Sequence, residues 1–465
     1  MKTTFSAVFC GLIAALTLFA SCAAGQATQE RTTLAGPLRI CATNPRYFAD
    51  PTGHPVYLTG SHTWESLQDG MLSGYTTVTQ PFDYTSYLDL LQANHHNFIR
   101  LWRWELTNHE PQPWVRTGSA KALDGQPKFD LRQFTPAYFD RLRARVIAAR
   151  QRGIYVSIML FEDWVFMAKR KDHPVELHPF HKENNVSNIN GDPNGDGWGI
   201  EIHTLQVPEV VAVQKSYVRK VIETVNDLDN VLYEICNEGK RHTRDWQYEL
   251  VRYVKSVEAE MPKQHPVGMT SVGDMNEDCL NSPADWTSLS TARWERTDDP
   301  WASAPPLAEG KKVVLLDTDH IGWKIYIDDD AFTRAWVWKS FTRGYSTLRM
   351  ENLSESSGWI AGRAAMGHTR RYAERMDLTK ATPQPALTTT GYCLANPGRE
   401  YLVYLPEAGS VTVDLSGTQG ALAVEWFHPE SGETTKGKSV QGGSSARFQT
   451  PFQAKDAVLY LHRVE

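Results

Sequence analysis

The feature that most limits the fold of this chain is a repeated alternation of strand and helix patterns over roughly 300 residues. Apolar runs typical of buried strands, such as "FIRLWRWE", "IYVSIMLFED" and "VLYEIC", are separated by segments with helical spacing, although no clear helix stands between the fifth and seventh strands. Helices that connect successive strands imply parallel pairing, and eight such units close into a (β/α)₈ barrel. We therefore predict a barrel over residues 36–382 that starts with a β-hairpin in "NPRYFADPTGHPVYLTG".

The pattern changes near residue 383. The segments "EYLVYLP", "SVTVDLS", "LAVEWFHP" and "AVLYLHRV" are short, alternate apolar with polar residues, and are separated by Gly, Pro and Ser. Regularly spaced strands of this kind are typical of an antiparallel β-sandwich. We predict a second domain of this type over residues 383–465.

Composition narrows the possible partners. The chain has 48 Lys and Arg against 54 Asp and Glu, a net charge of −6, and no basic run, which argues against nucleic acid as a partner. The 15 tryptophans fit either a large core or a cleft in which flat rings stack on sugars. No pattern predicts an oligomeric state, and the scattered cysteines do not predict a disulfide framework.

The first 24 residues resemble a bacterial export signal. Lys2 precedes an apolar stretch over residues 5–20, and small residues follow in "ASCAAGQ". Cleavage after Ala23 or Ala24 would release a secreted or periplasmic protein, whereas cleavage before Cys22 would leave a lipid anchor in the bacterial envelope. We expect export in either case, and no other segment is apolar enough to span a membrane.

The stretch "VLYEICNEG" ends an apolar strand on an amide and a carboxylate. In a barrel, residues at the carboxyl ends of strands form the functional site. Alternation places residues 232, 234, 236 and 238 on one inward side, with Asn237 at the rim. Glu234 would lie deeper in the barrel, where a carboxylate needs a cationic partner, and Arg100 on the second strand is the predicted one.

These segments resemble clan A glycoside hydrolases. "YEICNEG" is similar to their fourth-strand motif, "ANHHNFIRLW" to the segment that brings the clan arginine to the site, and the hairpin to the start of a group of bacterial glycosidases. The segment "ANPGREYLVYLPEAGSVTVDLS" resembles the module of that group labelled a collagen-binding domain. The resemblance implies that Glu238 is the general acid/base and that Asn237 bonds the sugar 2-hydroxyl.

The clan pattern also implies a second carboxylate, normally Glu, at the end of the seventh strand. That strand reads "KKVVLLDTDHIG" and contains no Glu. Asp317 and Asp319 share its predicted inward face, and we favour Asp317 narrowly as the nucleophile. A nearby carboxylate and partial burial should keep Glu238 protonated, while Arg100 or His320 should keep Asp317 ionised. The resemblance implies a retaining mechanism, which requires carboxyl groups about 5–5.5 Å apart, but the missing Glu leaves inversion as an alternative, for which a separation of about 6.5–9.5 Å would leave room for water.

Polar and aromatic residues follow the other strands and are predicted to bind substrate, although packing is the alternative for His62 and for each tryptophan. They are His62, Trp64, Trp102, Glu105, Asp163, Trp164, Arg293, Trp294, His320, Arg349 and Glu351. Glu351 is also a reserve catalytic carboxylate.

The loop "GDPNGDGWGIEIH" opens like a calcium-binding loop, with Asp192, Asn194 and Asp196 followed by Gly197. The twelfth position is His203 rather than the usual bidentate Glu, and the flanking helices of an EF-hand are missing from the pattern. We therefore interpret the loop as a polar turn, with calcium as the alternative, and expect no required cofactor.

The sequence as a whole predicts an exported glycoside hydrolase with a carbohydrate substrate. One alternative is a carbohydrate-binding or adhesion protein on a barrel that has lost catalysis, for which the missing Glu on the seventh strand argues. A less favoured alternative is a metal-dependent hydrolase, in which Asp317, Asp319 and His320 would join His62 around a metal.

Overall fold

The computed structural model describes residues 34, 36–70, 81–166, 175–291, 300–321, 330–350, 353 and 356–463. The predicted export signal lies outside this part of the chain, as do three predicted site residues, Arg293, Trp294 and Glu351. A search of the described residues finds no helix with the length and apolar character needed to cross a membrane.

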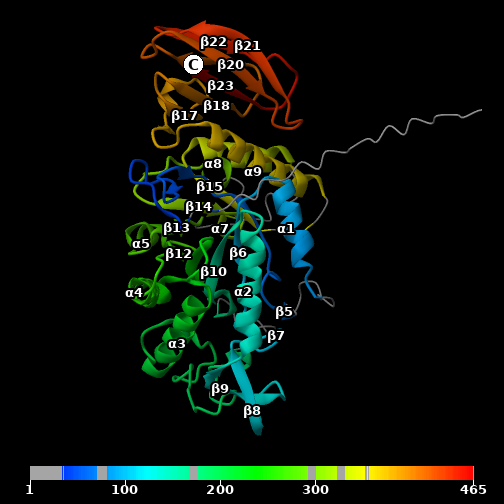
Figure 1. Ribbon diagram of the computed structural model, residues 1–465, viewed down its shortest axis with the longest axis vertical. Coiled ribbons are helices and arrows are strands. Elements are labelled where there is room, and N and C mark those ends of the chain that lie inside the picture. The colour runs from blue at the N-terminus through cyan, green and yellow to red at the C-terminus, as the bar shows by residue number, and fades with distance from the viewer. Residues whose placement is uncertain are drawn as a thin grey trace, which may run out of the picture. The chain divides into compact units, whose positions relative to one another are not determined.

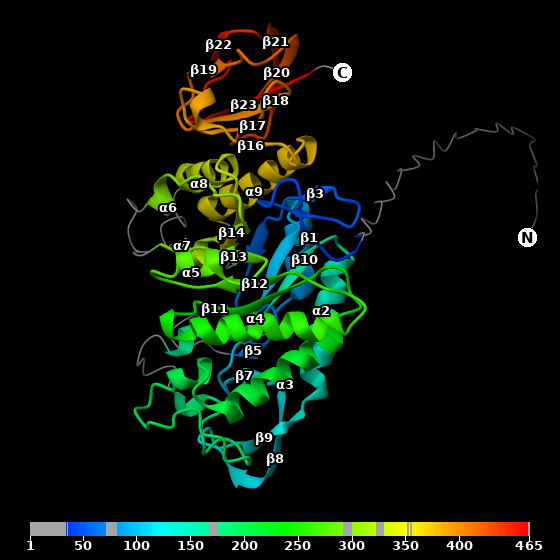
Figure 2. The ribbon, with the colours of Figure 1, turned by 90° about the vertical axis from the view of Figure 1, so that its left-hand side faces the viewer.

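Eight parallel strands form the central sheet, in the spatial order β4, β15, β14, β13, β12, β11, β10, β6. A parallel bridge between Thr63 and Leu101 joins the two outer strands, so the sheet closes on itself. Figure 2 shows β14, β13, β12 and β11 following one another in this order. The predicted (β/α)₈ barrel is therefore confirmed. The strands are β4 (Gly60–His62), β6 (Phe98–Leu101), β10 (Tyr155–Glu162), β11 (Val231–Asn237), β12 (Val267–Thr270), β13 (Trp286–Ser288), β14 (Val313–Asp317) and β15 (Ser346–Met350).

Helices cover the outside of the barrel (Figure 1). The longer ones are α1 (Tyr84–Ala93), α2 (Pro136–Arg150), α3 (Pro208–Val225), α4 (Arg244–Ala259), α8 (Asp330–Thr342) and α9 (Ser357–Arg375). Proline in the first turn of α2 and α3 starts each helix where the sequence predicts, because its missing N–H is not needed there. Among the described residues between the fifth and seventh barrel strands, where the pattern was unclear, only the short helices α5 (Asn276–Asn281) and α6 (Pro300–Ser303) occur. The short helix α7 (Thr318–Ile321) directly follows the seventh strand.

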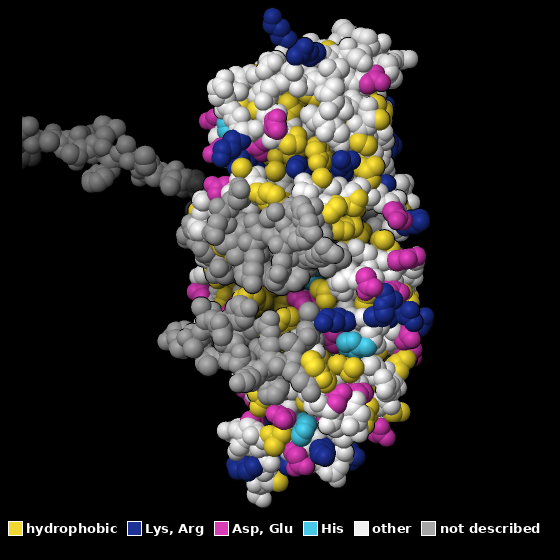
Figure 3. Space-filling model, turned by 180° about the vertical axis from the view of Figure 1, so that it is seen from behind, with side chains coloured by type: hydrophobic (Ala, Val, Ile, Leu, Met, Phe, Trp, Pro, Cys, Tyr) yellow, Lys and Arg dark blue, Asp and Glu magenta, His cyan; other side chains and the backbone are white. Residues whose placement is uncertain are grey.

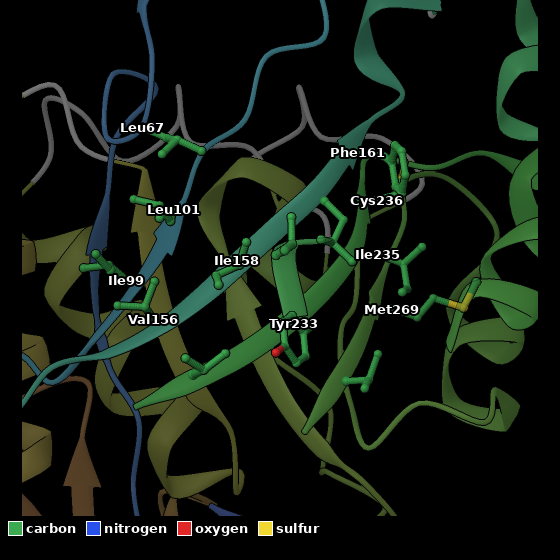
Figure 4. Packing of buried hydrophobic residues seen from close by; sticks show 14 of the residues in the cluster. Leu67, Ile99, Leu101, Val156, Ile158, Phe161, Tyr233, Ile235, Cys236 and Met269 are labelled. Atoms are coloured by element: carbon green, nitrogen blue, oxygen red, sulfur yellow. The ribbon is translucent and has the colours of Figure 1, made fainter. Parts of the chain in front are cut away.

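Two apolar layers surround the strands. The outer layer consists of strand residues such as Ile158 and Tyr233, which Figure 4 labels, and of buried residues from α2, α3 and α4. The inner layer fills the amino-terminal end of the barrel with residues such as Leu232 and Trp286. Gly268 on β12 faces the Trp286 ring on β13, and a Cβ there would lie 2.0 Å from the indole. The filled end leaves the carboxyl ends of the strands as the place for a site.

The C-terminal strands pair antiparallel in two sheets, which confirms the predicted β-sandwich. The larger sheet holds β16 (Thr382–Pro383), β17 (Cys393–Asn396), β18 (Glu400–Leu405), β23 (Ala457–Arg463), β20 (Ala421–Phe427) and β21 (Thr434–Gln441), and the smaller holds β19 (Ser410–Asp414) and β22 (Ser445–Gln449). Buried residues such as Val413 and Trp426 pack between the two sheets.

An apolar cluster joins the barrel helices to the sandwich. Trp338 of α8 stacks on Tyr404 of β18, with ring centroids 6.2 Å apart and planes 12° apart. Beside these rings the Arg334 guanidinium forms a buried bidentate ion pair with Asp456 at 3.0–3.1 Å. The sandwich therefore has a structural role as a packing partner of the barrel.

Short strands outside these sheets include one hairpin that the sequence analysis missed. β8 (Trp114–Lys121) and β9 (Pro127–Phe134) form an antiparallel ribbon after the second barrel strand (Figure 1). The alternating residues on either side of "LDGQ" were a usable signal for it. The remaining strands are β1 (Arg39–Ile40), β2 (Phe48–Ala49) and β3 (Pro55–Val56), which form the predicted N-terminal hairpin region, and the pair β5 (Asp69–Gly70) and β7 (His109–Glu110).

Acidic and basic side chains are interspersed on the face seen in Figure 3, where the described residues form no continuous basic area. The four cysteines of the described chain, Cys41, Cys236, Cys279 and Cys393, are free and buried, as expected for a fold without a disulfide framework.

Candidate active site

Arg100 lies at the centre of a buried polar cluster at the carboxyl ends of the strands. Its Nε donates to Glu234 Oε2 at 2.8 Å and its Nη2 donates to Glu234 Oε1, so the ion pair predicted from the sequence is present. The same guanidinium donates to Asn237 Oδ1 at 2.6 Å and to Asp317 Oδ2 at 3.0 Å. One side chain from β6 thus holds groups from β11 and β14 in fixed positions.

Asn237 points into the barrel. Simple alternation had placed it at the rim instead. Its Oδ1 accepts from Arg100, and the His320 Nε2 lies 3.1 Å from the same oxygen. Alternation breaks because Ile235 and Cys236 both pack into the outer apolar layer, so that Glu234 and Asn237 share the inner side (Figure 4). Within the described residues, the buried Asn237 Nδ2 has no hydrogen-bond partner, which leaves one N–H donor available beside the cluster.

Glu238 follows the strand in an unusual backbone conformation. Its φ is 51°, in the left-handed region that costs a residue with a side chain of order 1–3 kcal/mol and that clusters at functional sites. The side chain is only partly exposed at the barrel mouth. Burial, followed by the charges of Asp319 and Glu162, raises the pKa of the Glu238 carboxyl well above its ordinary value. The raised pKa favours the protonated form of Glu238, which can donate its proton.

Asp317 ends β14 and is fully buried. Its Oδ2 lies 2.7 Å from His62 Nε2 in an ion pair, and its Oδ1 accepts from the backbone N–H of Asp319 at 3.0 Å. Burial acts to raise the pKa of Asp317, but His62 and Arg100 outweigh it and hold that pKa well below the ordinary value. Asp317 is therefore ionised, with both oxygens already occupied.

Asp319 does not continue the strand, because the chain turns into α7 at Thr318. The predicted shared strand face of Asp317 and Asp319 is thus wrong, although both side chains reach Arg100. Asp319 Oδ2 lies 3.4 Å from Arg100 Nη1, and its side chain keeps 7 % of its surface exposed where Asp317 keeps none. Burial and the neighbouring Asp317 charge raise the pKa of Asp319 to about 6.

A second buried network lies beside the first and was only partly predicted. Glu105 contacts His203 Nε2 at 3.1 Å and His178 Nε2 at 3.2 Å, while Asp163 contacts His203 Nδ1 at 2.9 Å and His242 Nε2 at 3.2 Å. Burial acts to lower the pKa of His203, but Glu105 and Asp163 raise it to about 9. His203 is therefore a buried cation that fixes two predicted site residues.

Glu162, the last residue of β10, was not predicted as a site residue. Its Oε1 accepts from the Trp164 backbone N–H at 2.6 Å, and its buried Oε2 has no hydrogen-bond partner among the described residues. Burial, together with the charges of Glu105 and Asp163, raises its pKa well above the ordinary value. Its position at a strand end, next to the predicted Asp163, was the signal that could have identified it.

The tryptophans divide into two groups. Trp102 is buried, stacks on His62 with planes 10° apart, and lies under the Arg100 guanidinium at 5.0 Å, so it packs the cluster. Trp64 and Trp164 are partly exposed and pack against the apolar cluster that includes Trp102. Arg349 donates to the carbonyls of Gly358 and Trp359 in α9.

No three His, Cys, Asp or Glu side chains in the described part of the chain are arranged to hold a metal ion. His320, which the sequence places near a possible metal, instead has Nδ1 2.8 Å from the Ser288 hydroxyl. Burial and the nearby Arg100 lower the pKa of His320 to about 3, so its ring is neutral.

Comparison with known proteins supports the architecture. A solved structure of a protein described as "Glycoside hydrolase" superposes with a TM-score of 0.58 at 15 % identity, covering 92 % of this chain and 97 % of that one. A glycoside hydrolase family 5 protein from Bacteroides vulgatus gives 0.59 at 14 % identity, covering 92 % and 94 %. The chain therefore shares the fold of these two structures. Residues 385–462 match the family model "Putative collagen-binding domain of a collagenase", and no curated protein matches the sequence.

Proposed function

We propose that this protein is a glycoside hydrolase that uses two carboxylates at the mouth of its barrel. The observation that carries the proposal is the pairing of Glu238, whose pKa is raised well above its ordinary value, with Asp319, whose pKa is raised only to about 6 and whose charge acts on Glu238. Environments that push the pKa values of neighbouring carboxyl groups apart separate a general acid from an anionic partner. The likeness of the whole chain to glycoside hydrolase structures supports the same reaction class.

In this proposal Glu238 protonates the leaving-group oxygen and then serves as the general base toward water. We assign the second carboxylate to Asp319, although the sequence alone narrowly favoured Asp317. Asp317 has no exposed surface and both of its oxygens have partners, whereas Asp319 is partly exposed and is the charge that acts most strongly on Glu238. Asp317, held by His62 and Arg100, then acts as a positioning residue.

Other residues have supporting roles. The unused Nδ2 of Asn237 is a suitable donor for a sugar hydroxyl beside the reacting carbon. The partly exposed rings of Trp64 and Trp164 are suitable surfaces for sugar stacking. Glu105 and Asp163 act through His203, which they hold between them. The chemistry requires no cofactor, because the charge that develops on the sugar meets a carboxylate.

The decisive experiment replaces Glu238 by Gln and measures turnover of a panel of aryl glycosides and polysaccharides. We expect kcat/KM to fall about 10²–10⁴-fold, the usual contribution of a general acid or base. The control is Glu223→Gln on the exposed face of α3, which should retain full activity. If the wild type turns over none of the panel but binds a glycan, the carbohydrate-binding alternative replaces the enzyme proposal.

The identity of the second carboxylate has its own test. Asp319→Ala should be inactive and regain turnover with azide, which would attack the sugar in place of the missing carboxylate and give an azide of inverted configuration. Asp317→Ala should not be rescued, since its carboxylate does not reach the sugar. Rescue of Asp317→Ala alone would return the nucleophile role to Asp317. Activity of the folded wild type that disappears on chelation would favour the metal-dependent alternative.

The location of the protein is part of the same proposal. Export through residues 1–24 should release a protein that starts near Ala24 or Gly25, or one that carries a lipid on Cys22. The mass of the mature N-terminus from fractionated bacteria distinguishes these forms, and retention of the intact N-terminus in the cytoplasm would contradict export.

A further inference from the structure

The loop between β10 and α3 holds a polar segment that the proposed reaction does not use. Three backbone N–H groups in it donate to side-chain oxygens: Gly197 to Asp192 at 3.0 Å, Asp196 to Asn194 at 2.8 Å, and Trp198 to Asp196 at 2.8 Å. The Asn194 Nδ2 also donates to both Asp196 and Glu201. Hydrogen bonds thus connect Asn194, Asp196 and Glu201, and Asp192 is bonded to the same turn through Gly197.

Two carboxylate oxygens of this segment have no hydrogen-bond partner among the residues that the structure describes. Asp192 and Glu201 are 9 % and 5 % exposed, and neither Asp192 Oδ1 nor Glu201 Oε2 has a hydrogen-bond partner in the described chain. Neither carboxylate pairs with a Lys or Arg among the described residues. An unpaired buried carboxylate is costly, and in native proteins such groups are paired or bind metal ions. The Asn194 amide donates to Asp196 and Glu201, but an amide carries no charge that could neutralise the carboxylates.

We propose that this loop binds a calcium ion through Asp192, Glu201 and the Asn194 amide oxygen. All of these donors are oxygens, which a hard cation prefers, and the main-chain carbonyl at the seventh position, Trp198, is the usual additional ligand in loops of this spacing. The centre of the site is formed by two buried carboxylates and one amide. It therefore does not require three His, Cys, Asp or Glu side chains around one ion. Calcium suits it better than magnesium, because calcium accepts irregular geometry and sheds its waters more readily.

Glu201 can supply the carboxylate that the loop lacks at its twelfth position. The twelfth residue, His203, is no ligand, because both of its ring nitrogens contact Glu105 and Asp163. Glu201 instead supplies the last carboxylate two residues earlier, from the 3₁₀ turn Ile200–His203. Calcium would therefore fix the same turn that places His203 between Glu105 and Asp163. The site stabilises the loop and takes no part in bond cleavage.

The test uses the full-length mature protein stripped with chelator and then given calcium, magnesium or terbium. We expect calcium to raise Tm by a few degrees, and terbium to luminesce on excitation of Trp198 in the loop and to be displaced by calcium. Asp192→Asn and Glu201→Gln each remove a charge with little change of shape and should weaken calcium binding at least about tenfold, while Glu176→Gln, an exposed acid earlier in the loop, should bind as the wild type does.

A wild type whose Tm does not respond to calcium would overturn the proposal, as would variants Asp192→Asn and Glu201→Gln that both respond like the wild type. A response to magnesium alone would also overturn it. None of these readouts uses turnover, so they separate failure of the calcium site from failure of the proposed glycosidase activity.

Discussion

Arg100 and Glu234 form a bidentate ion pair inside the barrel, where their side chains are 1 % and 0 % exposed. The same guanidinium contacts Asp317, Asp319 and Asn237, so a pair that satisfies a buried charge also positions the candidate catalytic groups. Stability and function therefore depend on one side chain at this point of the fold.

The first prediction concerns this pair. Replacing Glu234 by Gln should lower the free energy of unfolding by about 3–5 kcal/mol, because it leaves a buried guanidinium with one charged partner fewer. Urea denaturation measures the change. The matched control is Asp227→Asn, which breaks the exposed pair with Arg143 and should cost no more than about 1 kcal/mol. Equal, small losses for both variants would contradict the importance of the buried pair.

The Arg100–Glu234 pair was predictable from the sequence. The period-two pattern of the strand "VLYEIC" places residue 234 inside the barrel, and a buried carboxylate needs a cation, of which "FIRLW" supplies one on a nearby strand. The barrel itself was predictable for a similar reason, since helices between strands imply parallel pairing. Features that depend only on which residues are buried could therefore be predicted from the sequence.

Other parts of the site depend on tertiary contacts that spacing does not encode. Asn237 turns inward because Cys236 joins the outer apolar layer, and Asp319 leaves the strand because α7 starts at once after Asp317. The network around Glu105 gathers His178 and His203 from long polar loops, whose path is set by packing and not by periodicity. Sequence reasoning found the acids of this network and missed its histidines.

The second prediction is a bell-shaped dependence of kcat/KM on pH. Asp319 must be ionised, so activity should fall as the pH drops through about 6, the value to which burial and Asp317 raise its pKa. Glu238 must be protonated, so activity should fall again as the pH rises through its own raised pKa. Initial rates at low substrate concentration from about pH 4 to pH 9 measure both limbs. Full activity retained at pH 4 would argue against Asp319 as the anionic group.

The third prediction concerns Glu162, which acts on Glu238 through its charge. Glu162→Gln removes a group whose ionisation opposes that of Glu238, so the alkaline limb of the profile should move to lower pH by on the order of one unit. A purely structural role would lower kcat without moving the limb. Glu110→Gln, outside both networks, is the control and should leave the limb in place.

Glu162 also makes a prediction for stability. A carboxyl group with a raised pKa in the folded state stabilises the protein fully below its unfolded pKa, and this contribution is lost as the pH rises through the folded pKa. Glu162→Gln stays neutral, so its free energy of unfolding should decline less than that of the wild type between about pH 5 and pH 9. Parallel urea denaturation series measure the difference, and identical slopes would show that Glu162 is ionised throughout.

The last prediction concerns the contact between barrel and sandwich. Arg334 and Asp456 are 4 % and 5 % exposed, and Tyr404 donates a further hydrogen bond to Asp456 at 3.0 Å. Asp456→Asn leaves the buried guanidinium of Arg334 with no ion-pair partner among the described residues, so we expect a loss of about 3–5 kcal/mol in urea denaturation. Lys380→Ala, which removes an exposed pair with Asp377, should cost no more than about 1 kcal/mol.

Because the Arg334–Asp456 pair adjoins the Trp338–Tyr404 stack, Asp456→Asn should also change the near-ultraviolet circular dichroism while leaving the pH profile of activity unchanged. A stable Asp456→Asn protein with an unaltered aromatic signal would mean that the sandwich does not depend on this ion pair for its place on the barrel.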